Sequence, residues 1–262
     1  MRRKDKEKKE KFEGVIYIST VLAFVIIVGI LIIKNYEPTR DTDKQGCFKD
    51  TGPNKYFEII VDNTEILNSV QERNIRKRIY KILEDADPND KVTIYSLDDS
   101  SLKNNFKPLI GRCSLKDGKN YNKWMENKNI LYKRWVELFD EPIKKALEDM
   151  MDKNKDSKVS PILELIQKIE SEIDNEKPTE IHLFSDLMQY SESFSFYDPD
   201  YNVENFLKSH EFNRVSTDLN GIDIYIWQLY NTKIEPKKLI LYWEAIFGKM
   251  NGEIANVEPI SG

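Results

Sequence analysis

Two acidic and two hydroxyl residues stand at positions where the ends of strands would bring them together. Asp62 directly follows an apolar run, YFEIIV, and Thr64 comes two residues later. Asp186 follows a second apolar run, EIHLFS, and Ser160 lies between the two runs in the chain. Carboxylate and hydroxyl oxygens are ligands for hard cations, and Mg²⁺ commonly keeps several waters beside them. The four residues therefore predict a magnesium site if the fold brings them to one place.

Each of these residues also has a purely structural explanation. Ser160 precedes Pro161, which is a favourable start for a helix with serine as its N-cap. Asp62 and Thr64 can close a loop through hydrogen bonds from the backbone to their side chains. Asp186 can accept hydrogen bonds from the N–H groups at the start of a helix. Any one residue is explained by such a local role, and it is the set of four that favours a binding site.

Four apolar runs have the composition of β-strands. Three of them are nearly continuous rather than alternating, which suits strands buried on both faces of a parallel sheet. The runs cover residues 56–61, 91–97, 180–185 and 222–229.

The segments between and after these runs carry apolar residues at helical spacing. A capping-box sequence, SVQE, opens the first helical segment at Ser69, and Pro142 is expected to kink or split the second. The alternation predicts a doubly wound α/β domain, with a mostly parallel sheet flanked by helices. In such sheets ligands bind at the carboxyl ends of the strands, where Asp62 and Asp186 stand. The helical patterns cover residues 69–86, 129–151, 160–173 and 236–250.

The composition is that of a solvated globular domain rather than of a nucleic-acid-binding protein. Charged residues make up 32% of the 262 residues, and the net charge is −5. Such a chain has no global basic field for a nucleic acid partner. Only two histidines are present, which leaves little material for a His-rich metal site or a His-based triad.

Residues 14–33 form a run of 20 residues without a charge, which predicts one transmembrane helix. At about 1.5 Å per residue the run spans roughly 30 Å, the thickness of a bilayer core. A cleaved signal peptide is disfavoured because the run is longer than an h-region and no A-x-A-like site follows it. Residues 1–13 hold seven Lys and Arg against three in residues 34–44, which predicts a cytoplasmic basic tail. We therefore expect a single-pass protein of the inner (cytoplasmic) membrane, with its C-terminal domain periplasmic or extracellular.

The chain after this run is expected to continue as a linker over residues 34–54, because the segment is polar and contains two prolines and two glycines. The folded domain is then expected over residues 55–262. The only cysteines are Cys47 and Cys113. In an oxidising compartment they are expected to form a disulfide, and two separate free thiols are the alternative. Closing the loop between them would contribute about 4 kcal/mol in the chain-entropy description.

Several stretches together resemble a von Willebrand factor A (vWA) domain, in particular the group of membrane-anchored bacterial vWA-like proteins. The stretches are IIVDNTE, KVTIYSL, SPILELIQ and LFSDLMQYSESFSFY, and the resemblance covers residues 55–250. PLIGRC and RWVELFDEPIKKALEDMM are similar to the same bacterial group. The resemblance implies a binding module in which an acid of a partner protein often completes the coordination of a metal ion.

The family's metal-ion-dependent adhesion site has the pattern D-x-S-x-S, with a Thr and an Asp from two later loops. By resemblance, Asp62 matches the first Asp, Thr64 the first hydroxyl, Ser160 the Thr and Asp186 the later Asp. The second Ser of the pattern falls at Ile66, which has no oxygen to offer. The resemblance therefore implies a degenerate site for Mg²⁺, in which water replaces the missing hydroxyl or which holds no metal.

The preferred hypothesis is a non-enzymatic membrane protein that presents this domain to a protein partner. One alternative is a metal-dependent phosphoester hydrolase, to which Asp98 and Asp99 would add acids. The other is a metal-free scaffold subunit of an envelope complex. Five aromatic residues after the later Asp suit a protein interface, unless they pack on their own domain. They are Tyr190, Phe194, Phe196, Tyr197 and Tyr201.

Overall fold

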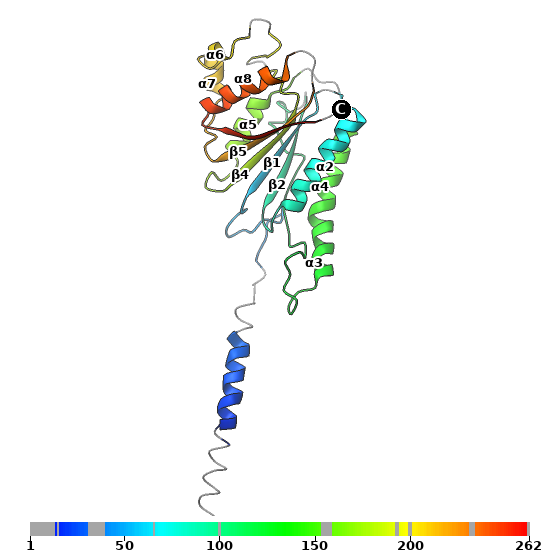
Figure 1. The fold of residues 1–262 in the computed structure, drawn as a ribbon, viewed down its shortest axis with the longest axis vertical. Coiled ribbons are helices and arrows are strands. Elements are labelled where there is room, and N and C mark those ends of the chain that lie inside the picture. Colours follow the sequence, from blue (N-terminus) through cyan, green and yellow to red (C-terminus); the bar gives the residue numbers. More distant parts are fainter. Residues whose placement is uncertain are drawn as a thin grey trace, which may run out of the picture. The chain divides into compact units, whose positions relative to one another are not determined.

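The fold is that of a computed structural model, which falls into two compact units with a boundary between Arg40 and Asp41. Figure 1 shows the chain coloured along its sequence. The described residues are 14, 16–30, 40–64, 66–98, 101–152, 159–191, 194–198, 201–230 and 234–260.

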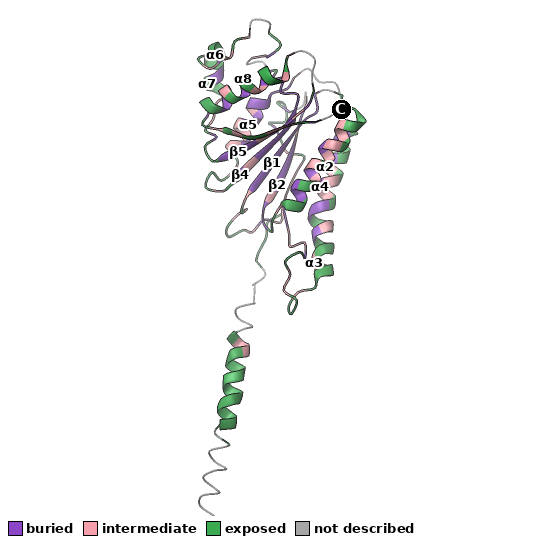
Figure 2. Cartoon of the chain, in the orientation of Figure 1, coloured by how far each residue is buried: buried purple, intermediate pink, exposed green. Residues whose placement is uncertain are grey.

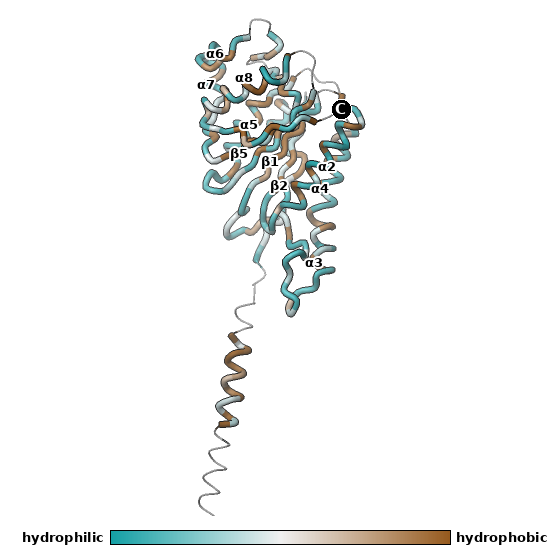
Figure 3. Tube along the Cα trace, viewed as in Figure 1, coloured by the Kyte–Doolittle hydropathy of each residue, from teal (hydrophilic) through white to brown (hydrophobic). Residues whose placement is uncertain are grey.

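In the first unit, residues 16–30 are helical, and their colouring in Figure 3 is predominantly that of hydrophobic residues. Among the described residues, no helix is both long and apolar enough to cross a membrane. The basic tail over residues 1–13, Val15 and residues 31–33 of the predicted span, and residues 34–39 of the predicted linker lie outside the described residues. The transmembrane helix and its orientation stay predictions.

The second unit contains a mixed sheet of six strands, in the order β3-β2-β1-β4-β5-β6. All neighbouring pairs are parallel except β2 with β3. The four strands predicted from apolar runs are confirmed to within one residue at each end, whereas β3 and β6 were not predicted. The strands are β1 (Tyr56–Asp62), β2 (Lys91–Leu97), β3 (Ile110–Cys113), β4 (Thr179–Ser185), β5 (Ile222–Gln228) and β6 (Glu253–Pro259).

Helices flank both faces of this sheet, as the α/β prediction requires (Figure 1). On one face of the sheet, apolar residues of α2 and α4 pack against β1 and β2. On the other face, apolar residues of α5 and α8 form the second apolar layer. The strands between them are largely buried (Figure 2). The helices are α2 (Ser69–Asp85), α3 (Lys128–Trp135), the π-helix η1 (Val136–Asp140), α4 (Glu141–Met151), α5 (Ile162–Glu170), α6 (Val203–Phe206), α7 (His210–Val215) and α8 (Pro236–Lys249).

Two helix boundaries differ from the sequence prediction for clear reasons. The N-cap of α2 is Asn68 rather than Ser69, because the Asn68 side chain accepts from the Gln71 N–H while the Gln71 side chain accepts from the Asn68 N–H. The segment predicted as one helix over residues 129–151 divides into α3, η1 and α4. Pro142 lies in the first turn of α4, where its missing N–H removes no hydrogen bond within that helix.

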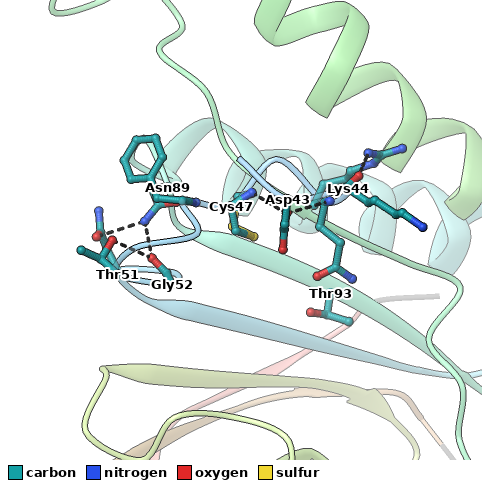
Figure 4. Close-up of a disulfide and its surroundings, with 12 residues drawn as sticks. Asp43, Lys44, Cys47, Thr51, Gly52, Asn89 and Thr93 are labelled. Carbon is teal, nitrogen blue, oxygen red and sulfur yellow. Dashed lines mark hydrogen bonds between the residues drawn. A yellow bond between two sulfur atoms is a disulfide. The ribbon is translucent and has the colours of Figure 1, made fainter. Parts of the chain in front are cut away.

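Residues 41–54, predicted as linker, belong to the compact unit of the sheet, so the domain begins earlier than expected. Cys47 and Cys113 form a disulfide, as expected, and both are buried. The buried Asn89 holds the same segment by accepting from Phe48 N at 2.8 Å and donating to Gly52 O at 2.7 Å (Figure 4). The linker was predicted from the polarity and turn residues of the segment itself. That local pattern does not include Cys113 or Asn89, which lie far along the chain and hold the segment on the domain.

Candidate functional site

The carboxylate of Asp62 is the centre of a buried hydroxyl cluster. Its Oδ1 accepts from Thr64 Oγ1 at 2.6 Å and from Thr64 N at 3.2 Å. Its Oδ2 accepts from Ser185 Oγ at 2.6 Å and from Ser160 Oγ at 2.9 Å. Each of these residues is at least nine-tenths buried. Three segments that are distant in the sequence therefore meet at one carboxylate.

The sheet register brings Ser185 to Asp62. Val61 of β1 lies opposite Phe184 of β4, so the next residues, Asp62 and Ser185, leave the parallel pair side by side. Ser185 was not predicted as a site residue. Its signal in the sequence is that it ends a strand directly before Asp186, but its role depends on a strand register that one sequence does not show.

Ser160 is held in place by the loop that follows β4. Ser160 N donates to Tyr190 O at 2.8 Å, and Tyr190 N donates back to Ser160 O at 2.9 Å. The N-cap position of α5 belongs to Pro161, and Ser160 donates its hydroxyl proton to Asp62 instead. The helix-cap explanation of Ser160 is therefore wrong, and the residue serves the cluster.

Asp186 reaches the same region through a constrained loop. Its Oδ1 accepts from Met188 N at 3.0 Å, so the predicted local role is present, although no helix begins there. Leu187, next to it, has a φ of 68°, a conformation that costs a bulky residue about 1–3 kcal/mol. Hydrogen bonds from Leu187 N to Ser185 Oγ and from Trp243 Nε1 to Leu187 O hold this turn.

A small cavity connects the two acids of the site. Its volume is about 200 Å³, and Asp62, Thr64 and Asp186 line it together with Ile66 and Tyr230. Ile66 is 73% exposed, so its side chain forms part of an open rim rather than replacing a ligand inside. The structure thus brings together Asp62, Thr64 and Asp186 around one space, and Ser160 joins them through its hydrogen bond to Asp62.

Burial raises the pKa of Asp62, and the hydrogen bonds from Ser185, Thr64 and Ser160 oppose that rise. Among the described lysine, arginine and histidine side chains, none forms an ion pair with Asp62. A buried carboxylate without a positive partner is costly, and a bound cation would lower that cost.

The donor set fits a hard cation. Every polar side chain at the site offers oxygen, and a hydroxyl that donates its proton to Asp62 keeps its lone pairs for another partner. Within the described part of the chain, no group of three or more His, Cys, Asp or Glu residues is placed to hold a metal ion. A cation here would therefore depend on hydroxyl and water oxygens as well as on Asp62 and Asp186.

Of the two acids that a hydrolase would add, Asp98 does not line this cavity. Asp98 lines a different cavity, to which neither Asp62 nor Asp186 contributes. Asp99 lies outside the described residues.

The five aromatic residues predicted as a partner-binding surface divide into two groups. Tyr190 and Tyr197 are each 40% exposed and contact one another edge to face, with ring centroids 5.8 Å apart. The other three pack on the domain itself, against rings of α6 and α8, so the packing alternative is correct for them. They are Phe194, Phe196 and Tyr201.

Comparison with known proteins shows only a broad likeness of fold. No family model and no curated protein matches this chain. Similar solved structures include a von Willebrand factor type A protein from Catenulispora acidiphila, with 9% identity and a TM-score of 0.40 over 80% of this chain and 39% of that one. Proximal thread matrix protein 1 from the mussel byssus has 12% identity and a TM-score of 0.43, over 80% of this chain and 42% of that one.

An aerotolerance-related membrane protein from Bacteroides fragilis has 11% identity and a TM-score of 0.38, over 80% of this chain and 92% of that one. The chain thus spans about two fifths of the mussel and Catenulispora chains. At these scores the likeness is one of general architecture and carries no functional inference.

Proposed function

We propose that this chain is a membrane-anchored binding protein whose vWA-like domain captures a protein partner through a divalent cation at the Asp62 cluster. The observation that carries the proposal is the convergence of Thr64, Ser160 and Ser185 on the carboxylate of Asp62. A loop that needed only a turn would use one local hydrogen bond. Hydroxyls from three segments around one buried acid are a costlier arrangement, which a ligand site explains.

Mg²⁺ is the cation that the donor set suits, and Asp62, Thr64, Ser160 and Asp186 are the residues that would hold it. When bound, the ion would supply a positive centre that an acidic side chain of the partner completes. The chain's own part is to bury the carboxylate of Asp62, to direct three hydroxyl protons onto it, and to fix Asp186 through the Leu187 turn. None of these roles requires a chemical reaction, so the proposal is a non-enzymatic one.

The experiment is calorimetric titration of the full chain in detergent micelles with Mg²⁺ and with Mn²⁺. We expect binding heat and a rise in melting temperature, because a ligand at 100 times its Kd stabilises by about 2.7 kcal/mol. Asp186→Ala should abolish both effects, and Asp223→Ala, which removes an exposed acid from β5, should leave them unchanged. Asp186 is the better target because Asp62→Ala would also leave three buried hydroxyls without their acceptor.

A metal-free scaffold is the second candidate, and one observation favours it. Both oxygens of Asp62 already accept hydrogen bonds from the protein, so the cluster is satisfied without an ion. Absence of heat and of a melting shift with either cation would contradict the metal-dependent function and support the scaffold. Cross-linking in intact cells then separates partner capture from metal use, because a scaffold keeps its cross-links in Asp186→Ala.

A further inference from the structure

A second cavity, of about 350 Å³, lies at the carboxyl ends of β1 and β2, beside α4. Asn63 contributes to it from the residue directly after Asp62, and Ser96 contributes from β2. Asp98 and Asp149 add two carboxyl groups. The cavity is therefore next to the Asp62 cluster in the chain, but it is lined by other side chains.

Two buried oxygen atoms in this lining have no hydrogen-bond partner among the described residues. They are Oδ1 of Asn63, a side chain that is 4% exposed, and Oγ of Ser96. Leaving a buried polar atom unpaired costs about 1–3 kcal/mol. Native proteins contain few such atoms, and two on residues that line one cavity indicate a partner that comes from outside the chain.

The chemistry of that partner follows from the lining. Both carboxylates and the amide oxygen accept hydrogen bonds, so the partner must donate them and carry positive charge. Asp98 N donates to Ser101 Oγ at 2.9 Å, which holds the position of Asp98. Asp149 is exposed on α4, and none of the ion pairs among the described residues involves it. The cavity is thus an acidic acceptor site with a buried floor.

The shape distinguishes an organic cation from a metal ion. A volume of 350 Å³ is far larger than one ion needs, and Leu109, Ala146 and Met150 give the cavity apolar walls. An arginine side chain matches both features, because it has an aliphatic stem and a planar head with five N–H donors in a fixed fork.

We propose that this cavity receives an arginine side chain of the partner protein. The inference rests on the proposed function, since it supplies a second contact for the partner captured at Asp62. Consecutive Cα atoms are about 3.8 Å apart, so Asp62 and Asn63 place the two contacts within reach of one short partner segment. That segment would present an acidic residue to the cation and an arginine to the second cavity.

The test uses the full chain, labelled with ¹⁵N in detergent micelles, and two blocked tripeptides. One is acetyl-Gly-Arg-Gly-amide and the other is its citrulline analogue, which has nearly the same shape but no charge. We expect the arginine peptide to shift the side-chain amide signals of Asn63 and the backbone signals of Ser96 and Asp149. Binding of the citrulline peptide should be at least tenfold weaker.

Two variants sharpen the result. Asp149→Asn should weaken binding of the arginine peptide at least fivefold, and its exposed position keeps the fold intact. Glu148→Gln removes a charge from the neighbouring position of α4, which is not part of the cavity lining, and should leave binding unchanged. Asn63→Ala should also weaken binding, and the exposed Asp149 variant decides the matter if Asn63→Ala does not fold.

Three outcomes would overturn the inference. They are no shifts with either peptide, equal binding of both, or shifts of these residues by Ca²⁺ alone. Asp186→Ala separates this inference from the proposed function, because it should leave arginine-peptide binding unchanged. If Asp186→Ala abolishes the response to Mg²⁺ while the wild-type chain does not bind the peptide, the arginine cavity is wrong and the cation site stands. Peptide binding by a chain that shows no response to Mg²⁺ contradicts the cation site alone.

Discussion

Asp62 and Glu58 are two buried carboxylic acids on the same face of β1, separated by Ile60. Asp62 is 4% exposed and accepts four hydrogen bonds. Glu58 is 2% exposed, and its side-chain donors are Thr93, whose Oγ1 lies 3.2 Å away, and Tyr95, while its Oε2 has no partner among the described residues.

The difference comes from the position of each residue along the strand. Glu58 stands within the sheet, where its neighbour on β2 is Thr93, and strand neighbours can supply few side-chain donors. Asp62 stands at the carboxyl end, where loops after β1 and β4 and before α5 all reach it. A buried acid surrounded by hydrogen-bond donors from several loops indicates a binding site. A buried acid that depends on strand neighbours for its donors indicates a residue whose burial destabilises the core.

Burial raises the pKa of both acids, and the two differ in the groups that oppose the rise. Burial raises the pKa of Glu58 to about 7, while Lys91, Thr93 and Tyr95 oppose the rise. Burial also raises the pKa of Asp62, and three hydroxyls oppose it there. We expect the two acids to respond in opposite ways to replacement.

The largest effect should come from Asp62→Ala. Hydrogen bonds to a charged acceptor contribute about 1.5–3 kcal/mol each, and part of that gain is offset by the cost of burying the carboxylate. We expect the free energy of unfolding at pH 7 to fall by about 4 kcal/mol in urea denaturation. Asp223→Ala, on an exposed acid of β5, is the control and should change it by less than about 0.5 kcal/mol. A similar small loss in Asp62→Ala would show that the hydroxyl cluster is not structural.

The next effect is a gain of stability in Glu58→Gln. Because the pKa is raised from 4.5 to about 7, the folded protein holds this proton more tightly than the unfolded chain does. The contribution of Glu58 to the free energy of unfolding is therefore fully present below pH 4.5, and it is lost as the pH rises through 7. At about 1.36 kcal/mol per pH unit the loss is about 3 kcal/mol, and glutamine, which does not ionise, avoids it.

Urea denaturation at pH 4.5 and at pH 8 measures this effect. The advantage of Glu58→Gln over the wild type should grow by about 3 kcal/mol between the two values. Glu253→Gln, at an exposed position of β6, should show no such growth. A constant difference between Glu58→Gln and the wild type would mean that Glu58 does not titrate in this range.

The smallest effects should come from removing one donor at each acid. Ser185→Ala deletes a 2.6 Å hydrogen bond to Asp62 together with the acceptor of Leu187 N, and it should cost about 2 kcal/mol at pH 7. Thr93→Val deletes the longer hydrogen bond to Glu58 with little change of shape and should cost about 1 kcal/mol or less. Thermal unfolding of both variants gives the comparison. Equal losses would contradict the distinction between a site acid and a core acid.

The central strands could be predicted from the sequence because burial on both faces leaves a continuous apolar pattern. β3 and β6 could not, since IGRC is short and EIANVEP is mostly polar, and each is an edge strand made by pairing rather than by burial. Asp62 and Asp186 could be singled out by their positions at strand ends. Ser185 and Asn63 could not, because the hydrogen bond from Ser185 to Asp62 depends on strand register and the unpaired oxygen of Asn63 depends on the surrounding fold.

For the five aromatic residues that follow Asp186, the sequence does not predict which side chains are exposed. Tyr197 and Phe196 are adjacent aromatic residues, yet Tyr197 is 40% exposed and Phe196 is 2% exposed. A high content of aromatic residues predicts that a segment will bury apolar surface. It does not show whether that surface packs on a partner protein or on the domain's own α8.

The disulfide between Cys47 and Cys113 has a mechanical consequence for a domain held by its N-terminal end. A pulling force on the chain before Asp41 enters the compact unit ahead of β1 and reaches Cys47 first. The covalent bond passes that load to Cys113 on the edge strand β3, beside the hydrogen bond from Cys113 N to Gln45 O. Asp62 lies within the loop that this bond closes, so the load from a partner held at Asp62 has two covalent paths to Cys47, one through β1 and one through β2, β3 and Cys113. Reduction of the disulfide would leave the path through β1 alone.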